Sequence, residues 1–464
     1  MSRFDGPSFV SRARRGAALA LALVLGATTA GAQQQEPPRT YIRDAEVEQL
    51  LREYLNPLLK VANQPAGAVK LAIVQDRSFN AFISNGRRMT LFTGAIIDAQ
   101  TPNELIGVMA HETGHISGGH LARLAQEMPK AQAIAILGSL LGVGALVGAS
   151  RANVGISGTA PGGLLMGGTE LAMRSLLAYQ RTEEAAADRA AITFLNATRQ
   201  SGLGMVNTLK RFAEQQMFLA SRIDKYLLSH PLATDRIAAI ETVAKESPYY
   251  EAKDPPALAL RHNLARAKLV AFTARQEEVN RRYPASDTSL PARYARAIVA
   301  HRFARGSEAQ ALLDGLIAAQ PGNPYFWELK GQNLLEAGQA QAALGPLQKA
   351  AGLAPGQPLL RVLLGHALIG TNLPANIDRA IKELTVAIQR DPEVLEAYVY
   401  LAQAYEKRGR SAEAELTTAE SYFMAGAYPQ AQMLAKRAQT KLQPGTPLWR
   451  RADEIATHKA SNKG

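Results

Sequence analysis

The second half of the chain repeats with a period of 34 residues, which constrains its fold more than any other feature of the sequence. Small and apolar residues recur at fixed positions in successive units, and a proline closes each unit. The first clear unit contains Ala297, Ala309, Leu313 and Pro321; the second contains Gly331, Ala343, Leu347, Ala350 and Pro355; the third, three residues longer, contains Gly365, Ala380, Leu384, Ala387 and Pro392. Units of this length indicate pairs of helices that stack side by side.

The spacing is that of tetratricopeptide repeats, so residues 256–455 are predicted to form an α-solenoid. A proline-rich linker, residues 253–256, precedes it, and residues 256–285 add a weaker helix pair. A degenerate last pair contains Ala419 and Ala438. The concave groove of such an array binds peptides or proteins and has no chemistry of its own. Any catalytic site is therefore expected in the first half.

The N-terminus predicts export. Four arginines within the first 15 residues precede an apolar run, residues 16–28, and Ala30-Gly31-Ala32 provides small residues for cleavage. This pattern is typical of a signal peptide over residues 1–32; an uncleaved anchor is the alternative. The formal net charge is +12, but the basic residues are scattered among acidic ones, which argues against nucleic-acid binding. A chain of 464 residues is long enough for two or three domains.

The first half contains the sequence HETGH. Thr101, Pro102 and Glu104 provide an N-cap, a first-turn proline and a capping box, so we expect a helix that runs uninterrupted to Leu121. Residues four apart share a face of a helix, so His111 and His115 would point at one spot, with Glu112 beside them. Two imidazoles and a carboxylate able to take a proton from metal-bound water are the components of a zinc hydrolase. The chain has no cysteine, which leaves histidine and carboxylate as metal ligands.

Three residues further along the chain are candidates for completing this site. Glu184 and Asp188 lie four residues apart in an alanine-rich helix expected over residues 171–196. Glu184 can serve as third metal ligand, and Asp188 can fix the tautomer of a ligating histidine. Glu183 is a competing ligand, and an ordinary solvated acidic face is the alternative. His230 precedes Pro231 and is therefore expected on a turn, either free to reach a cleft or incidental to helix capping.

The segments around the HETGH helix predict a small sheet and an apolar loop. Residues 44–61 have helical periodicity, and residues 69–76 and 79–94 have strand character, with a hairpin turn at Asn85-Gly86. An edge strand there could pair with an extended peptide, or only cover the helix. Residues 131–150 contain no charge, and a glycine-rich stretch follows to residue 168. This region is expected to be a flap over the cleft or a membrane-surface contact, with packed core as the alternative.

The HETGH, Glu184-to-Asp188 and His230-to-Ile237 motifs, in this order, resemble the M48 family of zinc metallopeptidases. The resemblance implies one Zn²⁺ held by His111, His115 and Glu184, with Glu112 as the catalytic carboxylate and Asp188 as the acidic residue that closes the family's ExxxD motif. His230 matches a histidine that in some secreted members can approach the zinc and hold the enzyme inactive; whether it inhibits or assists catalysis stays open. Arg236 matches the arginine of that last motif.

The fold expected is mainly α with a small β-sheet: a zincin-type metallopeptidase domain at residues 33–250, followed by the α-solenoid. With the signal peptide, this combination resembles secreted family members that carry tetratricopeptide repeats. It implies a periplasmic zinc endopeptidase that degrades misassembled or stalled outer-membrane proteins, with the repeat groove recruiting substrates or assembly machinery. One alternative is a chaperone or assembly adaptor with little proteolysis. Another is a protease anchored in the membrane through residues 131–168.

Overall fold

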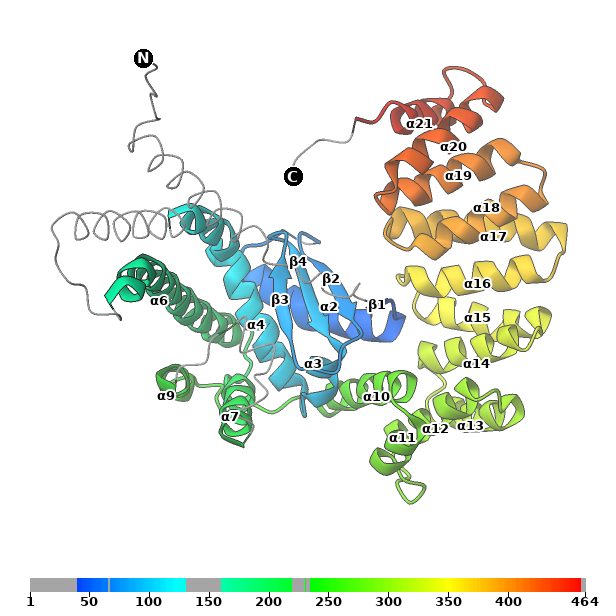
Figure 1. The fold of residues 1–464 in the computed structure, drawn as a ribbon. Helices are drawn as coiled ribbons and strands as arrows, with labels where there is room; N and C mark the ends of the chain where they lie inside the picture. The colour runs from blue at the N-terminus through cyan, green and yellow to red at the C-terminus, as the bar shows by residue number, and fades with distance from the viewer. Residues whose placement is uncertain (1–39, 66, 131–159, 219–229, 231–233, 460–464) are drawn as a thin grey trace, which may run out of the picture. The chain divides into compact units, whose positions relative to one another are not determined.

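The computed structural model describes residues 40–65, 67–130, 160–218, 230 and 234–459. The predicted signal peptide and most of the apolar segment 131–168 lie outside these residues. None of the helices described is both long and apolar enough to cross a lipid bilayer. Helices predominate and the one described sheet is small, as expected from the sequence (Figure 1).

The sheet has four strands in the order β1-β2-β4-β3. These are β1 (Tyr41–Ile42), β2 (Lys70–Val74), β3 (Ala81–Ser84) and β4 (Arg88–Phe92). Strand β2 pairs in parallel with β4, and β3 pairs antiparallel with β4 from Ala81↔Leu91 to Ser84↔Arg88. Asn85 and Gly86, with φ of 50° and 69°, form the predicted tight turn between β3 and β4. Strand β3 is consequently an edge strand.

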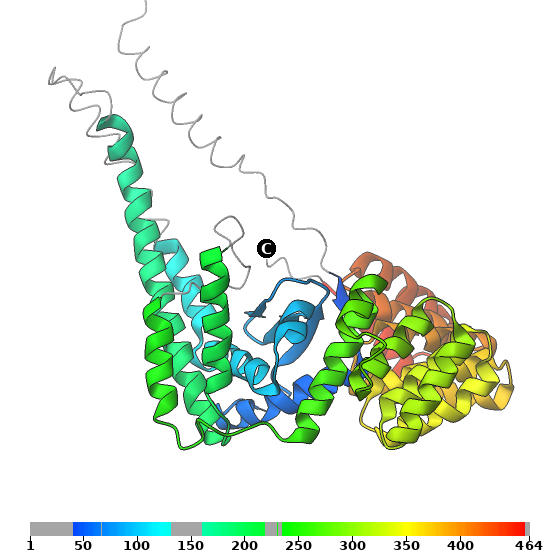
Figure 2. The ribbon, with the colours of Figure 1, turned by 90° about the horizontal axis from the view of Figure 1, so that it is seen from below.

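The first half of the chain also contains a helical segment at residues 120–130 and six described helices with defined bounds. They are α2 (Ala45–Val61), α3 (Thr93–Asp98), α4 (Pro102–Gly118), α6 (Ala160–Ala197), α7 (Leu203–Phe218) and α9 (Thr234–Lys245). Helix α4 carries HETGH and lies between the sheet and α6 (Figures 1 and 2). Two of its glycines let neighbouring backbones approach: a Cβ on Gly107 would lie 2.8 Å from Met205 Cβ of α7, and one on Gly114 2.8 Å from the Ala187 carbonyl oxygen of α6.

The predicted N-cap of α4 is confirmed, but the predicted end of the helix is wrong. Thr101 Oγ1 accepts from the Glu104 N–H at 3.2 Å, whereas the Glu104 carboxylate accepts from the Gln100 N–H rather than from that of Thr101. The helix ends at Gly118 instead of running to Leu121. Gly119 adopts the left-handed conformation, with φ of 66°, and caps the helix before residues 120–130 become helical again.

The repeats form the predicted series of helices. They comprise α10 (Pro256–Thr273), α11 (Gln276–Arg282), α12 (Leu290–Arg302), α13 (Gly306–Ala319), α14 (Pro324–Glu336), α15 (Ala340–Leu353), α16 (Pro358–Gly370), α17 (Pro374–Arg390), α18 (Leu395–Lys407), α19 (Ser411–Met424), α20 (Tyr428–Lys441) and α21 (Pro447–Ala456). The recurring alanines and leucines of the sequence pattern are buried where paired helices meet. A Cβ on Gly331 would lie 2.4 Å from Leu347 Cγ, which explains the recurring glycine.

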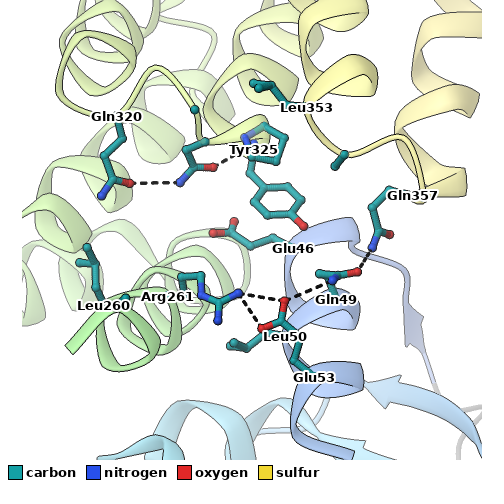
Figure 3. A pocket seen from close by; sticks show the side chains of 16 residues that line it. Glu46, Gln49, Leu50, Glu53, Leu260, Arg261, Gln320, Tyr325, Leu353 and Gln357 are labelled. Atoms are coloured by element: carbon teal, nitrogen blue, oxygen red, sulfur yellow. Dashed lines mark hydrogen bonds and ion pairs between the residues drawn. The ribbon is translucent and has the colours of Figure 1, made fainter. Parts of the chain in front are cut away.

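Helix α2 packs against the first repeats. One apolar core includes side chains from α2, the sheet, α4, α10, α12 and α14. The buried Lys268 of α10 lies 2.8 Å from Asp44 Oδ2 and 3.3 Å from Glu328 Oε2 of α14. Beside this core lies a cavity of about 690 Å³, where Arg261 Nη1 donates to Glu53 at 2.8 Å (Figure 3). The core therefore continues from the peptidase half into the repeats.

Candidate metal centre

Helix α4 brings His111 and His115 together as their spacing predicts. The two residues are one helical turn apart, and their Nε2 atoms lie 3.0 Å from each other. His111 is buried, while His115 reaches a cleft at the end of the helix. Both rings therefore direct the same nitrogen toward one point.

Glu184 of α6 faces that point. Its Oε2 lies 3.3 Å from His111 Nε2, and its Oε1 lies 3.3 Å from His115 Nε2. Helix α6 can approach α4 this closely because Gly114 faces the Ala187 backbone. The alanines around Glu184 thus belong to a helix contact, which argues against the solvated acidic face considered from sequence.

His230 supplies a fourth donor atom. Its Nδ1 lies 3.0 Å from Glu184 Oε1 and 3.4 Å from His111 Nε2. Among the described residues, His111, His115, Glu184 and His230 form a group whose ligand atoms all lie within 4.8 Å of one another. The sequence placed His230 on a turn, and the structure brings it to the cluster.

The spacing of these atoms is compatible with a bound metal ion. Bonds of about 2.0–2.1 Å to zinc would separate neighbouring ligand atoms by roughly 3.3 Å in a tetrahedron. Five contacts among His111, His115, Glu184 and His230, which involve both oxygens of Glu184, run from 3.0 to 3.4 Å. With one donor atom from each residue, all four atoms lie within 4.8 Å of one another. Three imidazoles and one carboxylate also match the ligand preference of zinc. The donor set of this chain therefore suits the ion that the sequence suggested.

Asp188 and Arg236 support the cluster from behind. Asp188 Oδ1 lies 2.9 Å from His111 Nδ1, the ring nitrogen opposite the cluster. This contact favours a proton on Nδ1 and leaves the lone pair of Nε2 for a metal. Arg236 donates to both Asp188 oxygens, and its Nη1 lies 3.1 Å from Glu184 Oε2. Asp188 occupies the supporting position expected from the sequence.

The charges of the cluster are set by burial and by mutual contacts. Burial alone would raise the pKa of Glu184, but hydrogen bonds from His111, His115 and His230 hold this pKa far below its ordinary value. Burial lowers the pKa of His115 to about 4. For His111 the lowering by burial is outweighed by Asp188 and Glu184, which raise its pKa to about 10. Of the two histidines of α4, His111 is therefore the one that carries an extra proton in the absence of an ion.

Glu112 is fully buried next to this cluster. In the described part of the chain, neither of its oxygens has a hydrogen-bond partner, although His230 Nε2 lies 3.3 Å from Oε1. Burial raises the pKa of Glu112, against the opposing effect of His230. Burying a carboxylate that accepts no hydrogen bonds lowers the stability of the fold. Such a group in a native protein therefore indicates a functional role. Glu112 is suited to accept and return a proton.

A cleft of about 170 Å³ opens beside the cluster. Edge strand β3 contributes Phe82 and Ile83 to its wall, and Tyr179 and Leu121 contribute from the helices. An extended peptide laid along β3 would thus pass the cluster. Edge strand β3 therefore lies beside the cleft, and its pairing with a peptide stays a prediction.

Sequence reasoning missed one neighbour of the cluster, His120, and considered another, Glu183, as a metal ligand. Glu183, weighed as a competing ligand, turns away and lies 2.9 Å from His120 Nε2. His120 in turn contacts His115. The Gly118-Gly119-His120 sequence, two residues after HETGH, was the available signal, but its meaning depends on a helix end that the pattern did not reveal.

Comparisons with known proteins agree with this site. Residues 42–244 match the model of peptidase family M48. The chain is 26% identical over 441 residues to the beta-barrel assembly-enhancing protease of Yersinia pestis, covering 91% of this chain and 87% of that protein. It is 24% identical to the protein of the same name from Escherichia coli strain K12, covering 86% and 80%. Among solved structures, MamA AMB-1 is 20% identical, with 36% of this chain and 96% of that chain covered and a TM-score of 0.31.

Proposed function

Since residues 42–244 of this chain match the model of peptidase family M48, we propose that the protein is a periplasmic zinc endopeptidase that acts on outer-membrane proteins during their assembly. The convergence of donor atoms from His111, His115, Glu184 and His230, all within 4.8 Å of one another, carries the enzymatic part of this proposal. The names of the relatives, which align over most of the chain, support the substrate class. The signal-peptide pattern of residues 1–32 supports the compartment.

In this function His111, His115 and Glu184 hold one Zn²⁺. When bound, zinc supplies Lewis-acid activation of water and of the peptide carbonyl. Glu112 accepts the proton of the attacking water and returns it to the leaving amine, which its burial beside the cluster suits. Asp188 keeps His111 in the ligating tautomer, and β3 orients the substrate by main-chain pairing.

His230 holds the site closed in the state described here. Its Nδ1 occupies the fourth corner of the donor set, where a substrate or water would bind, and its Nε2 lies next to Glu112. Opening requires His230 to withdraw. We assign it to inhibition rather than to transition-state stabilisation.

The test of the function is Glu112→Gln in the full-length chain. The variant should bind one zinc per chain like the wild type and lose cleavage of an unfolded protein substrate. Glu127→Gln, the same change at a surface residue paired with Lys130, is the matched control and should cleave normally. Proteolysis retained by Glu112→Gln would refute the mechanism.

A chaperone or assembly adaptor is the second candidate, favoured by the closed donor set around His230. The two functions differ in cells. If Glu112→Gln, expressed at the wild-type level, fully restored outer-membrane protein assembly in a strain lacking the protein, then the repeats and not the peptidase would be the working part. Failure of that variant supports the endopeptidase.

A further inference from the structure

We propose that His120 and Glu183 are positioning residues that prepare His115 to bind the metal. The inference rests on the proposed zinc site and concerns how this chain orients its own ligand. It assigns a role to the Gly-Gly-His sequence that follows HETGH and to the glutamate next to Glu184.

A line of four polar side chains leads away from the cluster. His115 Nδ1, the nitrogen opposite the metal side, lies 2.8 Å from His120 Nδ1. His120 Nε2 lies 2.9 Å from Glu183 Oε2, which accepts from Arg123 Nη2 at 2.7 Å. His120 is buried, so its contacts with His115 and Glu183 are shielded from water.

The line fixes one arrangement of protons. Glu183 is an acceptor only, so its contact places the proton of neutral His120 on Nε2. The lone pair of His120 Nδ1 then faces His115 and accepts the proton of His115 Nδ1. His115 is left with its lone pair on Nε2, the atom that faces Glu184 and His111. This is the tautomer that binds a metal.

The backbone is built to return His120 to this position. Gly119 reverses the chain in the left-handed conformation, which residues with a side chain rarely adopt. A Cβ on Gly118 would lie 2.1 Å from His120 Nε2 and 2.5 Å from its Cδ2. Both glycines are thus required for the His120 ring to lie against His115.

The two metal-binding histidines of α4 are supported in parallel ways. Asp188 contacts His111 Nδ1 directly, whereas Glu183 reaches His115 Nδ1 through His120. Glu183 and Glu184 are sequence neighbours on α6, yet one orients a ligand and the other is a ligand. His120 itself is not among the four residues whose donor atoms converge.

The test compares isosteric substitutions at His120, with zinc affinity measured by chelator competition. His120→Leu removes the acceptor for His115, and we expect zinc binding to weaken about 10–100-fold, as for other residues that support metal ligands. His120→Asn, of the same shape, keeps an oxygen near the position of Nδ1 and should recover most of the loss. Glu183→Ala should weaken zinc binding less than His120→Leu does. The double variant should bind zinc about as weakly as His120→Leu alone, since both substitutions act through the contact of His120 with His115.

A spectroscopic readout separates positioning from stability. In the zinc-free, ¹⁵N-histidine-labelled chain, His115 should be the Nδ1–H tautomer in the wild type and in His120→Asn, and shift toward Nε2–H in His120→Leu. Thermal unfolding of the zinc-free variants controls for general damage.

Equal zinc affinity in His120→Leu and the wild type would overturn the proposal. So would equal losses in the Leu and Asn variants, or an unchanged His115 tautomer. Failure of the proposed function would give a different result. If the zinc site itself were wrong, the wild-type chain would not bind zinc, and His111→Ala would not alter the measured zinc affinity.

Discussion

Arg236 donates two hydrogen bonds to Asp188, from Nε to Oδ2 at 2.8 Å and from Nη2 to Oδ1 at 2.9 Å. The same Oδ1 lies 2.9 Å from His111 Nδ1. The guanidinium of Arg236 therefore holds the Asp188 carboxylate in the orientation that contacts His111. Both partners are buried. The planar fork of arginine suits this paired contact, and a lysine ammonium cannot reproduce it.

We therefore expect Arg236→Lys to weaken zinc binding about tenfold and to lower the free energy of unfolding by about 3 kcal/mol. Chelator competition and denaturant unfolding measure the two effects. Arg189→Lys, an exposed arginine next to Asp188, is the control and should change neither quantity. Wild-type zinc affinity in Arg236→Lys would show that Asp188 needs no such support.

Zinc binding should release one proton per ion near pH 8. Asp188 and Glu184 outweigh the effect of burial and raise the pKa of His111 to about 10 in the ion-free chain, while burial lowers that of His115 to about 4. Zinc binds neutral imidazole, so His111 must lose its proton and His115 has none to lose. Affinity should therefore rise about tenfold per pH unit between roughly pH 7 and 9. Calorimetry in buffers of different ionisation enthalpy counts the protons; zero or two would contradict this charge assignment.

The same shift sets the pH dependence of stability without zinc. The folded-state pKa of His111 is raised above its unfolded value of 6.5, so its contribution is complete below pH 6.5 and is lost as pH rises through about 10. Added zinc should remove this dependence, because the ion replaces the proton.

Replacing His230 with alanine should raise peptidase activity, on the order of tenfold if the closed state predominates. The substitution frees the fourth corner of the donor set and leaves His111, His115 and Glu184 in place. His366→Ala, which removes a ring stacked on Tyr400 in the repeats, is the control for loss of a histidine elsewhere. Reduced cleavage by His230→Ala would instead assign His230 to catalysis.

Gly114→Ala should weaken zinc binding although Gly114 is not itself a candidate metal ligand. The new Cβ would lie 2.8 Å from the Ala187 carbonyl oxygen and 3.0 Å from Ala187 Cα, so α4 and α6 must separate. We expect a loss of about 1–3 kcal/mol in stability and weaker zinc binding, because Glu184 moves with α6. Gly345→Ala is the control, because a Cβ at this helical position would have no atom within 4 Å. It should leave the free energy of unfolding unchanged or raise it by up to about 1 kcal/mol. Similar effects of the two substitutions would exclude a specific helix contact.

Local patterns explain what the sequence could predict. The four-residue spacings of His111 with His115 and of Glu184 with Asp188 determine shared helix faces, and Asn85-Gly86 predicts its turn without reference to the rest of the fold. The repeats are likewise local, since each helix pair packs on its neighbours.

What the sequence could not predict depends on backbone direction and on contacts between distant segments. A glycine within a helical pattern is compatible with continuation or with a left-handed cap, and only the second brings His120 back to His115. Glu183 and Glu184 are the same residue type at adjacent positions. The position of α4 decides that Glu184 faces His115 and Glu183 faces His120. The contact of α2 with the repeats joins residues more than 200 apart, for which periodicity holds no information.

The core that α2 shares with α10, α12 and α14 bears on how this enzyme could be divided or regulated. Lys268 is buried among carboxylates from both sides of that joint, and removing the repeats would leave Asp44 and the apolar face of α2 without their partners. The first half of the chain and the repeats are therefore not two modules joined only by a flexible linker. Because α2 shares this core with the first repeats, a displacement of those repeats would also displace the packing partners of α2.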